Sequence, residues 1–288
     1  MAPTLALATC AHLPQLDPDA VHLVPALEAL GLMATPMVWD DPEAPFADAD
    51  LTVIRTCWDY VPRREQFCSF VDALPQVLND PATIRWNTDK VYLRDLAAAG
   101  FPIPTSHFAP PGTAVELPRG RCVLKPTVGS GSRGAHRFEV DEHEAALRHA
   151  AKLQAKGLTV LTQPYIDAVD TEGETAMIFF NGAFSHSITK GAMLLAGPGS
   201  ELDPTGLAFA ERITPHEPTT AEFDLAQRIV SWLTPTPLYA RVDLLPGPTG
   251  PLVVELELVE PGLFFGFTTG AEDRFARAIS DRLVALGY

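Results

Sequence analysis

An arginine and three acidic residues near the end of the chain alternate along two stretches that could pair as strands. Residues 238–259 read LYARVDLL, then a Pro- and Gly-rich turn, then LVVELELV. Alternating apolar residues on both sides of such a turn predict an antiparallel hairpin. Successive side chains point to opposite faces of a strand, so Arg241 shares a face with Asp243, and Glu255 shares a face with Glu257.

Two carboxylates on one strand can simply face water, and that interpretation stays open. Three acids on paired strands, however, repel one another unless a cation neutralises them. Mg²⁺ favours such oxygen ligands and completes its shell with water and phosphate oxygens. Arg241 beside the acids could stabilise the charge that develops on a transferred phosphoryl group. The residues therefore favour a magnesium–nucleotide site.

A loop of small residues follows a predicted strand over residues 121–125, which ends in Lys125-Pro126. Backbone amides of such a loop can surround phosphate oxygens, and a fixed ammonium beside it could pair with them. The loop matches neither GxGxxG nor GxxxxGK[ST], so it indicates neither a Rossmann site nor a P-loop. Its candidate phosphate-binding residues are Gly129, Ser130, Gly131, Ser132 and Gly134.

The first 84 residues alternate between strand and helix patterns, which predicts a small parallel sheet. Strands are expected at 4–9, 36–39 and 51–54, and helices at 19–30, kinked or starting late at Pro25, and at 64–78. RTCWDY (residues 55–60) follows the third strand, where open α/β sheets bind ligands. A turn anchored by a buried Trp explains this loop equally well.

The remaining patterns supply the elements between this sheet and the acidic hairpin. WNTDK opens a helix that we expect to be capped by Thr88 and to end at Gly100, and a second helix is expected at 141–156 with a D-x-x-E start. Asn181-Gly182 predicts a hairpin. Residues 190–215 are loop-like and favour a lid. Further helices are expected at 220–233 and 271–286.

Composition excludes several classes of protein. The net charge of −15 argues against a nucleic-acid surface, and 47% hydrophobic residues indicate a well-packed core. His143-Glu144 begins like HExxH, but Leu147 replaces the second histidine. The cysteines Cys10, Cys57, Cys68 and Cys122 have no zinc-site spacing and are expected as reduced thiols. Neither a signal peptide nor an apolar run long enough for a membrane span is present, so we expect a cytoplasmic protein that does not bind membranes.

The order of these motifs resembles the ATP-grasp superfamily of carboxylate–amine ligases over most of the chain. It is most similar to the compact RimK-like group, which includes the ligase that closes the ring of D-cycloserine. The resemblance implies an α/β (α+β) ATP-grasp fold, with a small parallel pre-domain and two α+β subdomains that grip ATP. The domains would span residues 1–86, 87–164 (with the phosphate loop) and 165–288 (with the metal hairpin).

The resemblance also assigns roles to individual residues. It implies that Lys90 and Lys125 reach the ATP phosphates, that Lys190 also contacts the nucleotide, and that Arg241 faces the transferred phosphate. The adenine hinge would consist of Gln163, Tyr165 and Ile166. Asp170 matches the ribose-binding acid, in competition with Glu172 and Glu174. The metal ligands would be Asp243, Glu255 and Glu257.

The implied reaction activates a carboxylate with ATP as an acyl phosphate, which an amine or an internal nitrogen then attacks. The implied cofactors are ATP and one or two Mg²⁺, with Mn²⁺ as a substitute; the substrates are amino-acid-like or peptide-like, and a homodimer is one expectation. Two departures from relatives are Glu257, where many have Asn, and Arg133, where many have a small residue. A small-molecule kinase and a non-catalytic nucleotide-binding protein remain alternatives.

The acyl substrate has a less specific signal than the nucleotide. We expect its pocket between the RTCWDY loop, the Arg241 hairpin and residues 260–262, with Arg55 or Arg133 available for a carboxylate.

Overall fold

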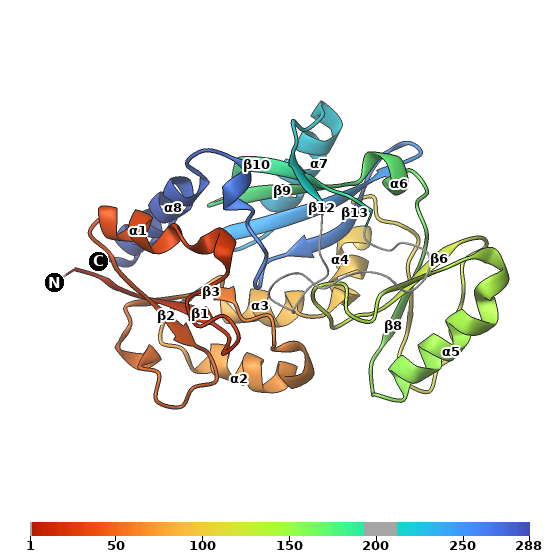
Figure 1. Cartoon of the computed structure of the whole chain (residues 1–288), viewed down its shortest axis with the longest axis horizontal. Coiled ribbons are helices and arrows are strands. Elements are labelled where there is room, and N and C mark those ends of the chain that lie inside the picture. Colours follow the sequence, from red (N-terminus) through yellow and green to blue (C-terminus); the bar gives the residue numbers. More distant parts are fainter. Residues whose placement is uncertain (1, 193–211) are drawn as a thin grey trace.

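The computed structural model describes residues 2–192 and 212–288. Three sheets follow one another along the chain (Figure 1). The first is parallel, in the order β2-β1-β3-β4, and its strands are Thr4–Thr9 (β1), Met33–Val38 (β2), Leu51–Thr56 (β3) and Val77–Leu78 (β4). Its helices are α1 (Leu23–Ala29) and α2 (Arg64–Ala73).

The alternation along β1 sorts the two faces of this sheet. Leu5 and Leu7 pack with α1, whereas Ala6 and Ala8 pack in a separate cluster with Phe67 and other residues of α2. Both faces are therefore buried, as expected for a parallel sheet covered by helices.

The second sheet is antiparallel, in the order β5-β8-β6-β7, and α5 (His143–Gln154) packs on it. Its strands are His107–Ala109 (β5), Cys122–Pro126 (β6), His136–Phe138 (β7) and Val160–Pro164 (β8). Short helices between the first two sheets are α3 (Pro81–Asn87), η4 (Lys90–Tyr92) and α4 (Leu93–Ala98).

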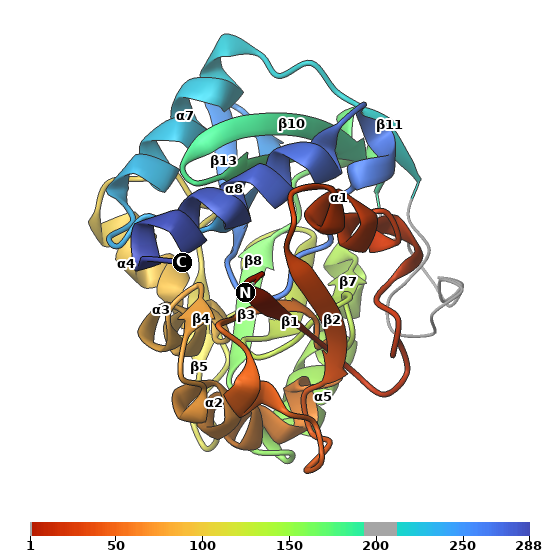
Figure 2. The same ribbon diagram turned by 90° about the vertical axis from the view of Figure 1, so that its left-hand side faces the viewer.

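The third sheet is antiparallel, in the order β11-β10-β9-β12-β13, and carries the acidic hairpin. Its strands are Glu174–Phe180 (β9), Ala183–Lys190 (β10), Ile213–Pro215 (β11), Tyr239–Gly247 (β12) and Gly250–Glu257 (β13). Met177 and Phe179 of β9 pack with α7 (Thr220–Trp232), whereas Ile178 and Phe180 pack with α8 (Ala271–Leu286). Figure 2 shows α8 beside α1, so one apolar cluster joins the first and third sheets.

Both predicted hairpins and the mixed fold class are confirmed, but several element boundaries were wrong. The helix from Arg64 ends at Ala73 because Leu74 precedes Pro75 and is extended, and β4 follows. Thr88 does not cap a helix start: Asp80 caps α3, Thr88 ends it, and Asp89 caps η4. The capping box before α5 uses Glu139 and Glu142, not Asp141 and Glu144.

The stretch predicted to be a loop from 190 to 215 includes strand residues at both ends. Lys190 is the last residue of β10, and β11 begins at Ile213. The remainder of this stretch, for which a lid was predicted, is residues 193–211 and lies outside the described part of the chain. The domain limits at 86 and 164 remain a prediction.

Two buried asparagines fix the first part of the chain to the acidic hairpin. Asn79 donates to the carbonyls of Tyr239 (3.0 Å) and Leu258 (2.8 Å) and accepts from the backbone amide of Leu238 (2.6 Å). Asn87 donates to the carbonyl of Leu256 (2.8 Å) and accepts from the backbone amide of Leu258 (2.7 Å). These bonds set the position of β12 and β13 against α3.

Replacing Asn79 with alanine is expected to lower the free energy of unfolding by about 3 kcal/mol or more, because three buried backbone groups lose their partner. Asp80→Ala, which removes only the α3 cap, should cost about 1 kcal/mol. Denaturant unfolding compares the two variants, and equal losses would contradict this role for Asn79.

Candidate active site

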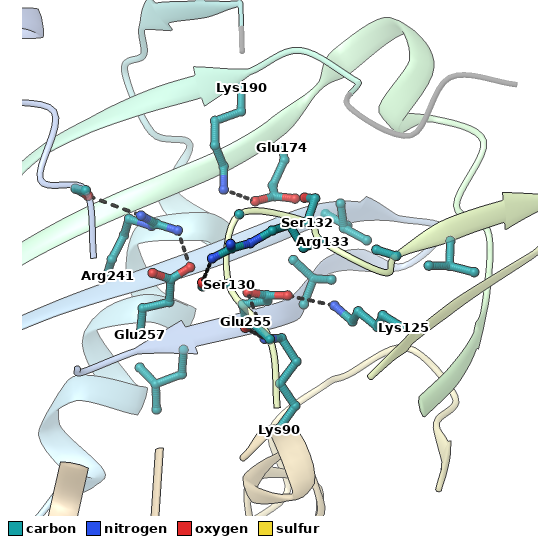
Figure 3. A pocket seen from close by; sticks show the side chains of 18 of the residues that line it. Lys90, Lys125, Ser130, Ser132, Arg133, Glu174, Lys190, Arg241, Glu255 and Glu257 are labelled. Atoms are coloured by element: carbon teal, nitrogen blue, oxygen red, sulfur yellow. Dashed lines mark hydrogen bonds and ion pairs between the residues drawn. The ribbon is translucent and has the colours of Figure 1, made fainter. Parts of the chain in front are cut away.

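A cavity of about 500 Å³ lies where the second and third sheets face each other, next to the loop after β3. Its wall includes Lys90, Lys125, Lys190, Arg133 and Arg241, and the acids Glu174, Glu255 and Glu257 (Figure 3). Glu260 also lines it. The candidate residues from all parts of the sequence thus converge on one cavity, except that Arg55, Gly134, Asp170, Glu172 and Asp243 do not line it.

The hairpin register brings its charged residues into pairs. Arg241 lies opposite Glu257, and Asp243 lies opposite Glu255. Arg241 forms a two-point contact with Asp243, in which Nε donates to Oδ1 (2.8 Å) and Nη2 to Oδ2 (2.8 Å). Nη2 of Arg241 also pairs with Glu257. Period-2 alternation on two antiparallel strands therefore produces the predicted cluster.

Lysines from three other elements complete this network. Lys125 at the end of β6 bonds Glu255 Oε1 with Nζ at 2.7 Å, and Lys90 Nζ lies 3.8 Å from Oε2. Lys190 bonds Asp243 Oδ2 at 2.8 Å and also pairs with Glu174. The cations predicted to bind phosphate thus hold the acids predicted to bind metal.

The donor set fits Mg²⁺, because Asp243, Glu255 and Glu257 are hard oxygen ligands with compensated charge. In the described residues their oxygens do not all come within 4.8 Å of one another. Arg241 and the lysines lie among the three carboxylates. Phosphate groups that attract the lysines would free the carboxylates for an ion, so binding of nucleotide and metal should be coupled.

The pKa values of the cavity acids separate according to their partners. Burial acts to raise the pKa of Glu255, but the ammonium groups of Lys125 and Lys90 outweigh it and hold that pKa far below its usual range. Burial raises the pKa of Glu174 and of Glu257 to about 7, despite Lys190 and Arg241. Burial, with repulsion from Glu257, raises the pKa of Glu260 to about 8.

These raised values predict a pH dependence of stability without ligands. The folded protein holds protons on Glu174, Glu257 and Glu260 more tightly than the unfolded chain does, so stability is lost as the pH rises through their folded pKa values. From about pH 6 to about pH 9 the loss should be on the order of 5 kcal/mol, because each group contributes about 1.4 kcal/mol for every pH unit up to its folded pKa. Thermal melting measures this loss of stability, and Mg²⁺ with ATP should reduce the loss. A melting temperature that rises with pH would contradict the prediction.

The loop after β6 forms one wall of the cavity and rests on the first domain. Lys90 Nζ donates to the carbonyl of Gly129 at 2.8 Å, and Arg133 Nη2 donates to the carbonyl of Trp58 at 2.8 Å. Gly134 has φ +78°, which favours glycine, and its carbonyl bonds His149 Nε2 at 2.9 Å. Arg133 therefore fixes the loop instead of disrupting it.

The predicted adenine hinge lines the cavity at the end of β8, with Gln163, Tyr165 and Ile166. Asp170 in α6 (Val169–Glu172) lies apart from the cavity wall; its carboxylate accepts from the Tyr165 hydroxyl and pairs with Arg137 at 3.5 Å and Arg121 at 3.8 Å. Of the three acids that competed for the ribose, Glu174 is the one in the cavity wall.

The two arginines considered for a substrate carboxylate differ in position. Arg55 is 1% exposed, does not line the cavity, and donates to the carbonyl of Pro261 at 3.2 Å. Arg133, in contrast, lines the cavity together with Trp58 and Tyr60 of the RTCWDY loop. The sequence did not predict that Arg55 is buried behind residues 260–262. Its strand shows no alternation of polar and apolar residues that would tell a buried face from an exposed one.

A second group of side chains of metal-ligating types lies outside the cavity and has no spacing signal in the sequence. The four cysteines are free and buried, but His12 and Asp59 come within 4.8 Å of Cys10. Both carboxylate oxygens of Asp59 already accept hydrogen bonds, from Trp39 (2.8 Å) and Arg63 (2.7 Å). We assign this group a structural role in the loop after β3.

Lys125→Ala is expected to weaken ATP binding about 10- to 100-fold, since a contact between a charged group and phosphate is lost. Lys152→Ala changes an exposed lysine of α5 by the same charge and serves as the control. Equilibrium binding with labelled ATP measures both variants. An unchanged affinity for Lys125→Ala would remove this residue from the site.

An antiparallel sheet with a lysine and a small-residue loop, facing a second sheet with an Arg–acid hairpin, defines the ATP-grasp class of ligases. A family model described as the N-terminal domain of D-cycloserine synthetase DcsG matches residues 5–79. The cycloserine biosynthesis protein DcsG of Streptomyces lavendulae is 34% identical to this chain over 97% of the chain and 98% of its own length. The chain therefore belongs to the DcsG family of ATP-grasp ligases.

Solved structures agree with this assignment. The crystal structure of D-cycloserine synthetase DcsG matches with a TM-score of 0.87 and 31% identity, over 97% of this chain and 99% of that one. D-alanine–D-alanine ligase from Bacillus anthracis shares the fold, with a TM-score of 0.69 and 15% identity over 99% and 98% of the two chains. The protein is an ATP-dependent ligase that joins an activated carboxylate to a nitrogen, which confirms the predicted class. The described helices include none with the length and apolar character of a membrane span.

Proposed function

We propose that this ligase closes a ring within one small amino-acid-like substrate, by joining its carboxylate to a nitrogen of the same molecule. The observation that carries the proposal is the near full-length match at 34% identity to a protein named for cycloserine biosynthesis. Cycloserine is a cyclic α-amino acid derivative whose ring contains a bond between the carboxyl carbon and nitrogen. A carboxylate ligase acting within one molecule forms this kind of bond.

The cavity residues suit activation of the carboxylate by ATP. Lys90, Lys125 and Lys190 would bind the phosphates, and Glu174, in place of Asp170, would bind the ribose hydroxyls. Phosphoryl transfer needs positioning and charge neutralisation more than a protein nucleophile. Arg241 would neutralise the transferred phosphoryl group, so that a carboxylate oxygen can approach it.

The remaining site residues hold the metal and exclude water. Asp243, Glu255 and Glu257 would hold one or two Mg²⁺, which neutralise charge between the phosphates, and Mn²⁺ would substitute. The loop from Gly129 to Gly134 would cover the phosphates, and its contact through Arg133 to Trp58 would keep water from the acyl phosphate. The homodimer and the cytoplasmic location remain predictions.

The test uses β-aminooxyalanine, in both D and L forms, because its ring closure yields cycloserine directly. We expect ADP, phosphate and the cyclic product from one form with Mg²⁺ and ATP, and a hydroxamate when hydroxylamine competes. A panel of other amino acids, dipeptides and ureido derivatives defines the acyl donor more widely. An amide that forms only with a separate amine donor, without the cyclic product, would contradict ring closure and leave an intermolecular ligase. ADP release without any hydroxamate would favour a kinase.

A further inference from the structure

Four glutamates line the cavity, and Glu260 differs from the other three. Glu174 pairs with Lys190, Glu255 with Lys125, and Glu257 with Arg241. Within residues 2–192 and 212–288, the Glu260 carboxylate forms no ion pair with any lysine or arginine, although the residue is only 9% exposed. A buried carboxylate without a cation is costly, so its position suggests a cation supplied by a ligand.

The backbone around Glu260 is held from three directions. Trp58 Nε1 donates to the carbonyl of Glu260 at 2.8 Å, Arg55 donates to that of Pro261 at 3.2 Å, and Arg241 donates to that of Gly262 at 3.1 Å. These donors come from β3, from the loop after it and from the hairpin. The direction in which Glu260 faces the cavity is therefore fixed by side chains outside its own segment.

Glu260 lines the cavity next to the Arg241 hairpin, where we expect the acyl substrate to bind. The nucleotide hinge at Gln163 to Ile166 belongs to β8 and the turn after it, whereas Glu260 follows β13 and is close enough to Glu257 to raise its own pKa. Trp58 and Arg133 line the same cavity. A carboxylate that attacks the phosphoryl group held by Arg241 would come from this side.

We propose that Glu260 binds the ammonium group of the acyl substrate and so selects carboxylic acids that carry a free amine. The inference rests on the proposed ligase reaction and adds the residue that recognises the amine of its amino-acid-like substrate. Glu260 would lie beside the substrate without taking part in the phosphoryl transfer, which Arg241 and the metal ligands perform. An ammonium group would supply the opposite charge that no lysine or arginine of the described residues places within ion-pair distance of this carboxylate.

The test compares β-aminooxyalanine with 3-aminooxypropanoic acid, which keeps the carboxylate and the nitrogen nucleophile but lacks the α-amine. With wild type we expect hydroxamate formation from the amine-bearing compound at a KM about 10- to 100-fold lower. Glu260→Gln should raise that KM by the same factor and leave kcat and the KM of the deamino compound nearly unchanged. Glu28→Gln, at an exposed position of α1, is the charge-matched control.

Two kinetic results would overturn the proposal. In the first, Glu260→Gln still discriminates between the two compounds as wild type does. In the second, Glu260→Gln needs more Mg²⁺ but has an unchanged KM, which would place Glu260 in the metal site. If wild type forms no hydroxamate, the proposed ligase reaction does not occur on these compounds. A binding measurement then tests the role of Glu260 separately. With Mg²⁺ and a non-hydrolysable ATP analogue, only the amine-bearing compound should raise the melting temperature of wild type, and Glu260→Gln should abolish the rise. Equal shifts, or none, would contradict the role of Glu260.

Discussion

Arg241→Met is expected to lower the rate of acyl-phosphate formation by about 10³- to 10⁵-fold, the effect known for arginines that neutralise a transferred phosphoryl group. Arg241 is 7% exposed and bonds Asp243 and Glu257, so its guanidinium is held in place before substrate binds. Arg241→Lys keeps the charge but loses the two-point contact, and we expect it to recover only part of the rate. Hydroxamate formation at saturating ATP measures both variants.

The same substitution also affects folding, so the two effects must be separated. Arg241→Met leaves the buried carboxylate of Asp243 and the half-buried carboxylate of Glu257 without this partner, which should cost about 3–5 kcal/mol of stability. Arg241→Lys should be much closer to wild type in melting temperature. A folded Arg241→Lys variant that turns over at the wild-type rate would contradict the proposed role of the guanidinium.

Glu255→Gln is expected to reduce ligation by about 10³-fold or more, because the metal loses a charged ligand. Glu255 also holds Lys125 at 2.7 Å and Lys90 at 3.8 Å, so its neutralisation releases two cations toward phosphate. ATP binding without Mg²⁺ should therefore be as tight as in wild type or tighter. Calorimetric titration with ATP, with and without Mg²⁺, separates these effects.

The control for Glu255 is again the exposed Glu28→Gln, which should change neither quantity. We infer that Glu255 pairs with the lysines before ligands bind and with the metal afterwards. Ligation at the wild-type rate in Glu255→Gln, or weaker ATP binding than wild type in the absence of Mg²⁺, would contradict this inference. Normal binding of magnesium–ATP by this variant, together with a wild type that never turns over, would favour a non-catalytic nucleotide-binding protein.

The sequence predicted the hairpin and its charged face because both depend on local rules. Period-2 alternation places Arg241 with Asp243 on one strand face and Glu255 with Glu257 on the other strand, without any knowledge of the remaining fold. The cross-strand pairs Arg241–Glu257 and Asp243–Glu255 depend on a register shift between Asp243 and Leu244, which the sequence did not predict. The small-residue loop after Lys125 was found in the same way, because glycine and serine mark a backbone that can approach a ligand.

The remaining features depend on contacts between distant segments. Lys190 meets Asp243 across 53 positions of the sequence, and Arg55 meets Pro261 across 206, so neither contact has a local signal. Asp170 and Glu174 are both acidic and lie close together in the sequence, so the sequence does not distinguish them. In the structure α6 directs Asp170 toward Arg121 and Arg137. The predicted boundaries were wrong near Pro75, where Leu74 is extended and ends α2. They were also wrong near Thr88, where the end of α3 and the cap of η4 lie at neighbouring residues.

The measurement that tests the central claim most directly is transfer of heavy oxygen from the substrate carboxylate to phosphate. If the carboxylate is activated as an acyl phosphate, β-aminooxyalanine labelled with ¹⁸O in its carboxylate should yield inorganic phosphate with one ¹⁸O atom per turnover, together with ADP. Mass spectrometry of the released phosphate detects the label. Unlabelled phosphate, or label in AMP with release of pyrophosphate, would contradict this account of the reaction.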